Sequence, residues 1–119
     1  KIEHYFLHCI SSYPNKEENS YLNNIKHLSK KLNCQVGLSD HTNDINTSIY
    51  AYIIGSRIFE KHFKLSSKDK CVDAPVSISP FQLKNLVNQL AKVEKILGKV
   101  KFGPRDIEKP ILIYKRRSK

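Results

Sequence analysis

Two histidines that lie 21 residues apart could together bind a metal ion, because each closes a short apolar run. The runs are Gly37-Leu38-Ser39-Asp40-His41-Thr42 and Phe59-Glu60-Lys61-His62-Phe63. Each run is typical of a β-strand that ends in an imidazole. Two adjacent parallel strands would bring both rings to the same edge of a sheet, and neutral imidazoles bind borderline divalent ions. The pattern therefore predicts a metal site or a catalytic rim.

Two carboxylates, Asp40 and Glu60, lie within two residues of these histidines and are candidate catalytic groups. A carboxylate that accepts the second N–H of a ligand histidine fixes the tautomer of that ring. A different interpretation fits the sequence equally well: Asp40 caps a loop, and Glu60 pairs with a lysine. Both interpretations remain open at the level of sequence.

The elements that would position these residues alternate between strands and helices. Strands are expected at 5–10, at about 35–39 and at about 57–61, and the first is apolar enough for a strand buried on both faces. Apolar spacing predicts one helix from near Ser20 to 32 and a shorter one over 45–53, closed by Gly55. Ser79-Pro80-Phe81-Gln82 has the form of a capping box and begins a helix that Gly98 ends. This order predicts an α/β fold of repeated βα units, with parallel strands and outer helices.

The composition describes one globular domain with a basic surface. The chain has 119 residues, of which 39% are apolar and 27% charged, and a formal net charge of +10. Such a charge could attract nucleic acid. However, the basic residues are scattered, and the one dense run, Lys115 to Lys119, has no interleaved aromatic residues that could stack on bases. We therefore expect a solvated lysine-rich surface and no nucleic-acid partner.

Membrane insertion and disulfides are not expected either. No apolar stretch approaches the roughly 18 residues of a membrane-spanning helix, and the first residues lack the apolar core of a signal peptide. Cys9, Cys34 and Cys71 are odd in number and widely spaced, so we expect reduced and mostly buried thiols. These features favour a cytoplasmic protein.

Four motifs in order resemble the sialic acid synthase family, which includes synthases of N-acetylneuraminate, pseudaminate and legionaminate. The motifs are His8-Cys9-Ile10-Ser11-Ser12-Tyr13-Pro14, Gly37-Leu38-Ser39-Asp40-His41-Thr42, Glu60-Lys61-His62-Phe63, and Asp73 followed by Ser77-Ile78-Ser79-Pro80. The resemblance covers nearly the whole chain. It implies that 1–110 form the last three βα units of a TIM (β/α)8 barrel. Residues 111–119 would be a basic tail leading toward an antifreeze-like domain that this chain lacks.

The resemblance also implies an activity: condensation of phosphoenolpyruvate with an N-acylated hexosamine, such as N-acetylmannosamine, to give a nonulosonic acid and phosphate. A divalent ion, Mn²⁺ or Mg²⁺, would be held by His41 and His62 and would polarise the aldehyde oxygen as a Lewis acid. Asp73 matches the residue that contacts the sugar, and Ser11 and Tyr13 match positions that line the substrate pocket. His8 closes a strand too, but its match in the family is not a ligand, so a structural role is expected.

The chain departs from the family at the sugar pocket and lacks most of the active site. Cys71-Val72 precede Asp73 where the family commonly has Gly-Pro, and Lys64 replaces a threonine, which leaves the hexosamine open. The phosphate-binding lysines and catalytic glutamates of the family come from earlier strands. We therefore expect a partial catalytic domain that is inactive alone, and a homodimer for the full-length enzyme. The alternatives are a truncated, non-catalytic binding or assembly module and, with less support, a basic nucleic-acid-binding domain.

Overall fold

Three parallel strands form the centre of the fold, in a computed structural model that describes residues 4–66 and 68–114. The strands are β1 (Phe6–Cys9), β2 (Val36–Asp40) and β3 (Phe59–Lys61), and they pair in the order β1-β2-β3. In register, Cys9 lies opposite Ser39, and Ser39 lies opposite Glu60. The predicted α/β class with parallel strands is confirmed, and each strand lies within two residues of its predicted bounds.

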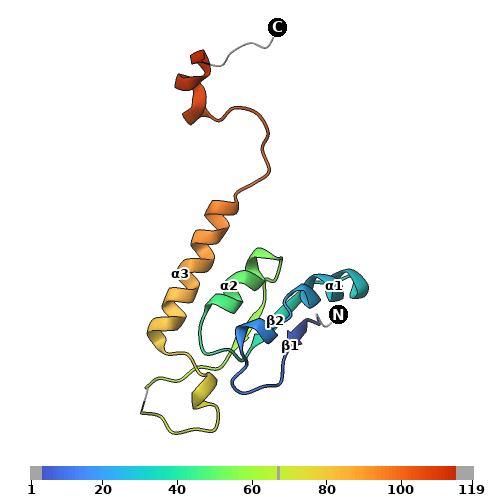
Figure 1. The fold of residues 1–119 in the computed structure, drawn as a ribbon, viewed down its shortest axis with the longest axis vertical. Helices are drawn as coiled ribbons and strands as arrows, with labels where there is room; N and C mark the ends of the chain where they lie inside the picture. Colours follow the sequence, from blue (N-terminus) through green and yellow to red (C-terminus); the bar gives the residue numbers. More distant parts are fainter. Residues whose placement is uncertain (1–3, 67, 115–119) are drawn as a thin grey trace.

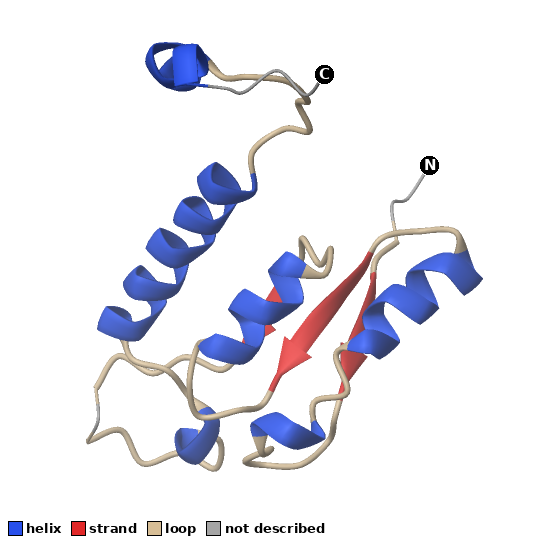
Figure 2. Cartoon of the chain, turned by 45° about the horizontal axis from the view of Figure 1, so that its top comes forward, coloured by secondary structure: helices blue, strands red, loops and turns tan. Residues whose placement is uncertain are grey.

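Helices follow each strand, as the sequence predicts. They are α1 (Asn23–Leu32), α2 (Asn46–Ile53) and α3 (Pro80–Leu97), with 3₁₀ segments η1 (Glu17–Asn19), η2 (Ala74–Val76) and η3 (Asp106–Tyr114). Figure 2 shows the strands as parallel arrows with α1 and α2 lying across the sheet. An added bridge between Phe63 and Ile78 continues the parallel pairing beyond β3 and leads into α3.

The main core lies between the sheet and the first two helices. Val36 and Leu38 of β2 pack with Ile25 of α1 and Ala51 of α2, and all four side chains are buried. Because Val36 and Leu38 are two residues apart, they lie on the same face of the strand. Both helices therefore cover that one face, which we call the helix-side face.

The opposite face of the sheet is open in this chain. The expectation that the first strand is buried on both faces is wrong. Cys9, on the open face, is exposed. On the helix-side face, Phe6 is 51% exposed, while His8 is buried and its Nε2 lies 2.8 Å from the carbonyl oxygen of Ser20. The expectation of mostly buried cysteines is wrong as well: Cys9 on the open face and Cys71 in a loop are exposed, and Cys34 is half-buried. A strand is buried only where other segments pack against it, so its own apolar residues do not determine its burial.

The helix ends follow local signals with one exception. The predicted capping box of α3 is present, with Ser79 and Gln82 bonded reciprocally, and Gly98 ends the helix at φ 57°. The first helix, however, begins three residues later than predicted. Ser20 ends η1, and Tyr21 adopts φ 44°, so the chain changes direction before α1 starts.

Beyond α3 the chain extends away from the sheet, as Figure 1 shows in orange and red. The arm contains η3, whose apolar side chains, Ile107, Ile111, Ile113 and Tyr114, are exposed. Of the predicted basic tail, 115–119 lie outside the described residues. Within 4–66 and 68–114, no helix is both long enough and apolar enough to cross a membrane.

Candidate functional site

Alternation along the strands sorts the candidate residues onto two faces. In β2, Ser39 and the following His41 share one face, whereas Asp40 lies on the other. In β3, Glu60 and the following His62 share the open face, whereas Lys61 lies on the helix-side face. The two histidines follow the carboxyl ends of adjacent parallel strands, so both reach the same rim of the open face.

The structure brings the two predicted metal ligands together. The ring centroids of His41 and His62 lie 5.3 Å apart, with 45° between the ring planes. The ring of Tyr13 lies 4.0 Å from His41 and 5.6 Å from His62, centroid to centroid. Asp73 Oδ2 lies 3.7 Å from His62 Nδ1, and both side chains are partly exposed. Four predicted site residues from four separate segments therefore form one cluster.

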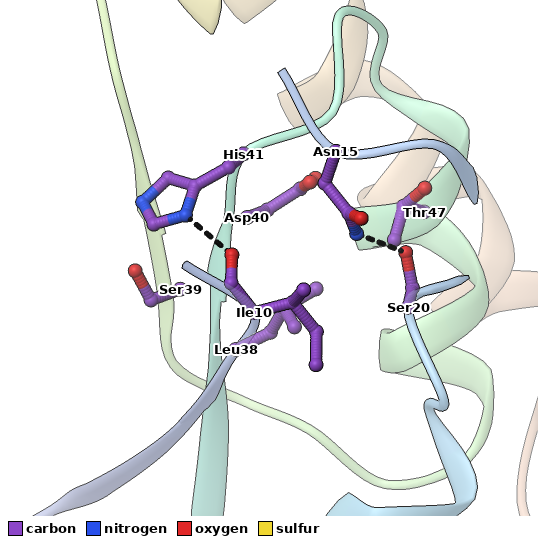
Figure 3. Close-up of a pocket in the computed structure, with 8 residues that line it drawn as sticks. All are labelled: Ile10, Asn15, Ser20, Leu38, Ser39, Asp40, His41 and Thr47. Atoms are coloured by element: carbon purple, nitrogen blue, oxygen red, sulfur yellow. Dashed lines mark hydrogen bonds between the residues drawn. The ribbon is translucent and has the colours of Figure 1, made fainter. Parts of the chain in front are cut away.

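The environment of His41 fixes which of its nitrogens can bind a ligand. Its Nδ1 lies 2.9 Å from the carbonyl oxygen of Ile10, and Figure 3 shows this bond joining the end of β2 to the loop after β1. A carbonyl oxygen only accepts hydrogen bonds, so Nδ1 carries the proton and donates. In the neutral ring this leaves the lone pair on Nε2. Cys9 Sγ lies 3.9 Å from the same Nδ1 and adds a weaker contact.

A small cavity beside this bond is too small for a sugar. It measures about 10 Å³ and is lined by residues drawn in Figure 3, among them Asn15, Ser20 and Thr47. A volume of about 10–15 Å³ suits a single water molecule. This cavity can therefore hold no more than a single water molecule.

Glu60 lies beside polar side chains that were not among the residues predicted from the sequence. Ser39 Oγ donates to Glu60 Oε1 at 2.7 Å, and Cys9 is the register partner of Ser39 on the other side. The alternative interpretation pairs Glu60 with a lysine. Among the described residues, no ion pair between Glu60 and a lysine is found. Ser39 was identifiable in principle, since it lies two residues before His41 on the same face. The catalytic role of Glu60 stays a prediction.

Asp40, the other predicted catalytic carboxylate, points away from the histidine rings. Its Oδ1 accepts hydrogen bonds from the backbone N–H of Thr42 at 2.9 Å and from Thr42 Oγ1 at 2.7 Å. Its Oδ2 accepts from Ser48 of α2 and lies 3.0 Å from Lys61 Nζ. These bonds favour the second interpretation given above, in which Asp40 caps the loop after its strand. The prediction of a catalytic role for Asp40 rested on its closeness to His41 in the sequence. Successive side chains of a strand point to opposite faces, so adjacent residues such as these two are separated by the sheet.

Ionisation of two side chains is shifted by these surroundings. Burial lowers the pKa of the Lys61 ammonium from its usual value, and the neighbouring Asp40 opposes that shift. Partial desolvation raises the pKa of the Tyr13 hydroxyl, and the negative charges available at Cys9, Asp73 and Glu60 raise it further. Tyr13 is therefore held as the neutral phenol over the ordinary pH range.

The remaining predicted pocket residue, Ser11, lies in the exposed loop between β1 and Tyr13. Its Oγ lies 4.0 Å from Cys9 Sγ, at the limit of a sulfur hydrogen bond. Ser11 therefore neighbours the cluster without contacting a histidine. The same loop carries the Tyr13-Pro14 peptide in the cis form, which is almost always found before proline.

The described residues supply two imidazoles to a possible ion and no complete ligand set. Within 4–66 and 68–114, no group of three or more His, Cys, Asp or Glu side chains is placed to hold a metal ion. Two rings bound to one ion through metal–nitrogen bonds of about 2.1 Å would place their centroids roughly 5 Å apart. The observed 5.3 Å separation fits that arrangement. Any further ligands would come from water, substrate or other segments.

Parallel strands, covering helices and polar side chains gathered at the carboxyl ends of the strands define an α/β protein with a candidate binding site at that edge of the sheet. The sequence model of the NeuB family matches residues 2–102. The chain belongs to this family.

Relatives and a solved structure agree with this assignment. The N,N'-diacetyllegionaminic acid synthase of Legionella pneumophila is 35% identical over 112 residues, which are 94% of this chain and 32% of the relative. The pseudaminic acid synthase of Campylobacter jejuni is 34% identical over 107 residues, or 90% and 30% of the two chains. The N-acetylneuraminic acid synthetase of Leptospira borgpetersenii, solved with citrate, superposes with a TM-score of 0.81 at 34% identity, over 92% of this chain and 39% of that one. The chain thus spans about a third of the length of the curated relatives that it matches.

Proposed function

We propose that this chain forms the last three βα units of the (β/α)8 barrel of a nonulosonic acid synthase. The enzyme would condense phosphoenolpyruvate with an N-acylated hexosamine, such as N-acetylmannosamine, and release phosphate. The observation that carries the proposal is the cluster of His41, His62, Tyr13 and Asp73 on the open face of the sheet. In a TIM barrel, active sites lie at the carboxyl ends of the strands, where this cluster is found.

The proposal assigns His41 and His62 to a divalent ion, Mn²⁺ or Mg²⁺. His41 suits this role because its Nδ1–H is bonded to Ile10, which orients the ring and leaves the Nε2 lone pair available. When bound, such an ion would supply Lewis acidity toward a carbonyl oxygen. Asp73 lies 3.7 Å from His62 Nδ1 and favours a proton on that nitrogen, which directs the other one toward the ion.

The other residues of the open face would bind and orient the substrates. Tyr13 covers one side of the His41 ring and keeps water from it, while its neutral hydroxyl can donate a hydrogen bond to a sugar oxygen. Asp73 is 47% exposed and can accept hydrogen bonds from sugar hydroxyls. Glu60 is held by Ser39 and faces the same space, where it can take up or hold a proton. Ser11 would contribute at the edge of the pocket.

The open surfaces of the fold support the view that the catalytic site is only partly contained in this chain. Within the described residues, β1 pairs only with β2, and Phe6 at this outer strand is half exposed. Val87 of α3, on the apolar stripe of that helix, is 58% exposed. Parallel strands are normally covered on both faces, and a closed barrel has no free edge. The proposal therefore includes no turnover by the chain alone. The resemblance to the family adds a homodimer for the full-length enzyme and a cytoplasmic location to the proposal.

A chimeric enzyme tests the proposal. Residues 2–102 would replace the matching third of the Campylobacter jejuni pseudaminic acid synthase, and phosphate release from phosphoenolpyruvate would be measured with a panel of N-acylated hexosamines. We expect release that depends on a hexosamine and falls to background in the same chimera with His41→Ala and His62→Ala. A folded chimera without hexosamine-dependent release would refute the proposed activity.

The same open surfaces favour one second candidate, a non-catalytic assembly module that pairs its strand edge with another polypeptide. Size-exclusion chromatography of the chain would separate the two candidates when combined with the chimera. Stable self-association together with an inactive chimera would support the module. A monomeric chain and an active chimera would exclude it.

A further inference from the structure

A buried polar network on the helix-side face joins the two strands that carry the histidines. Lys61 Nζ lies 3.0 Å from Asp40 Oδ2 and donates to the carbonyl oxygen of Thr42 at 2.6 Å. Thr42 Oγ1 is a further acceptor for it at 3.3 Å, and Asp40 in turn accepts from Thr42 and from Ser48. The network therefore connects β2, the following loop, α2 and β3 through hydrogen bonds.

These groups are almost completely removed from solvent. The side chains of Lys61 and Asp40 are 5% and 1% exposed, and Thr42 and Ser48 are buried as well. Taking both charges out of water is costly, and apolar side chains of similar volume often give equal or greater stability than a buried ion pair. A gain in stability is therefore a weak explanation for this pair, and a geometric role explains it better.

The position of the network supplies that role. Asp40 and Lys61 are register partners in the β2 and β3 pair, and each immediately precedes one of the histidines. Lys61 also holds the backbone carbonyl of Thr42, the residue after His41. Lys61, which precedes His62, therefore binds both the residue before His41 and the residue after it.

We infer that Lys61 is a positioning residue that sets the separation of the His41 and His62 rings by tying Asp40 and Thr42 to the end of β3. The rings lie on the open face and Lys61 lies on the other, so it acts through the backbone and touches neither ring. The inference rests on the proposed function only in treating His41 and His62 as the ligand-binding residues of the site.

The test uses the whole chain with Lys61→Met, which is unbranched, one atom shorter than lysine and uncharged. Lys30→Met, at an exposed position of α1, is the matched control. Ring-to-ring nuclear Overhauser effects between His41 and His62 would be measured without metal, and Co²⁺ affinity would be measured separately. We expect Lys61→Met to unfold at a lower urea concentration than the wild type, because the Asp40 carboxylate stays buried without its partner. In the folded variant, without urea, we expect the ring-to-ring signal to be lost and Co²⁺ to bind at least tenfold more weakly.

The two readouts separate this inference from the proposed function. An unchanged ring-to-ring signal in Lys61→Met, or its absence in the wild type, would overturn the positioning role. A normal signal in the wild type without Co²⁺ binding would instead count against the metal site. If Lys61→Met does not fold, the double variant Asp40→Asn with Lys61→Met leaves no unpaired buried charge and still lacks the Lys61 ammonium, and a ring-to-ring signal retained there would equally overturn the inference.

Discussion

The phenol ring of Tyr13 lies over the imidazole of His41, with their centroids 4.0 Å apart and their planes at 31°. The two residues are brought together by the loop after β1 and the end of β2, which are also joined by the bond from His41 to Ile10. This contact gives the imidazole one covered side and one fixed nitrogen. The nitrogen left free to bind a ligand is Nε2, so substitution of His41 is a direct test of the site.

Removal of either histidine should weaken binding of a divalent ion. Loss of even a residue that orients a ligand typically costs about 10–100-fold in metal affinity, so His41→Ala and His62→Ala should each cost at least about tenfold. Isothermal titration with Mn²⁺ would measure this, and His27→Ala, at an exposed position of α1, serves as the control. Unchanged affinity in both variants would show that the pair binds no metal.

Tyr13 should ionise at a higher pH than an ordinary tyrosine. Desolvation and nearby negative charge raise its pKa above the usual 10.0 in the folded chain. The unfolded chain therefore loses this proton first, and the stability that Tyr13 contributes is present below pH 10 and declines as pH rises through the folded pKa. Tyrosinate absorbance, taken as the difference between wild type and Tyr13→Phe, would measure the shift. A midpoint at or below the ordinary value would contradict this prediction.

A side chain at residue 37 should not fit in β2. A Cβ added to Gly37 would collide with the carbonyl oxygen of Ile58 and with the side chain of Leu7. Overpacking of this kind costs about 1–3 kcal/mol, so Gly37→Ala should unfold at a lower urea concentration. Gly103→Ala is strained locally because residue 103 has φ 88°, but it lies in the arm away from the sheet, an added Cβ there meets nothing within 4 Å, and unfolding of the sheet should be nearly unchanged. Equal stability of the two variants would mean that the neighbours of Gly37 move aside.

The capping box should make a measurable contribution to α3. Ser79 Oγ accepts from the backbone N–H of Gln82, and the Gln82 side chain accepts from the backbone N–H of Ser79. Ser79→Ala should cost about 1 kcal/mol of unfolding free energy, and Gln82→Ala should cost less. Thermal unfolding followed by circular dichroism measures both. If the Gln82 change costs more than the Ser79 change, the serine is not the main cap.

Features encoded by neighbouring residues were predictable from the sequence. The ends of α3 follow from Ser79, Gln82 and Gly98, because capping bonds form within a single helical turn. The meeting of His41 and His62 was predictable too, since parallel strands place their carboxyl ends at one edge. Tyr13 and Asp73 reach this edge from loops, and the sequence indicated them only through resemblance to a family.

Features that depend on distant segments were not predictable. Strand alternation alone could have placed Asp40 on the face away from His41, but its partners Ser48 and Lys61 required the packing of α2 and β3. The exposure of Cys9 depends on what covers the open face, and that of Phe6 on what packs beside the outer strand β1; neither is determined by the strand that carries them.

The division of β2 and β3 into two faces has a consequence for protein engineering. Ser39 and Glu60 lie on the open face, whereas Asp40 and Lys61, one residue further along each strand, join β2 to β3 on the helix-side face. A directed-evolution library for the proposed site should place its substitutions on the open face, for example at Ser39, and should keep Asp40, Lys61 and the proposed catalytic residue Glu60 constant. Diversity would then be concentrated where it changes recognition, and few library members would be lost to misfolding.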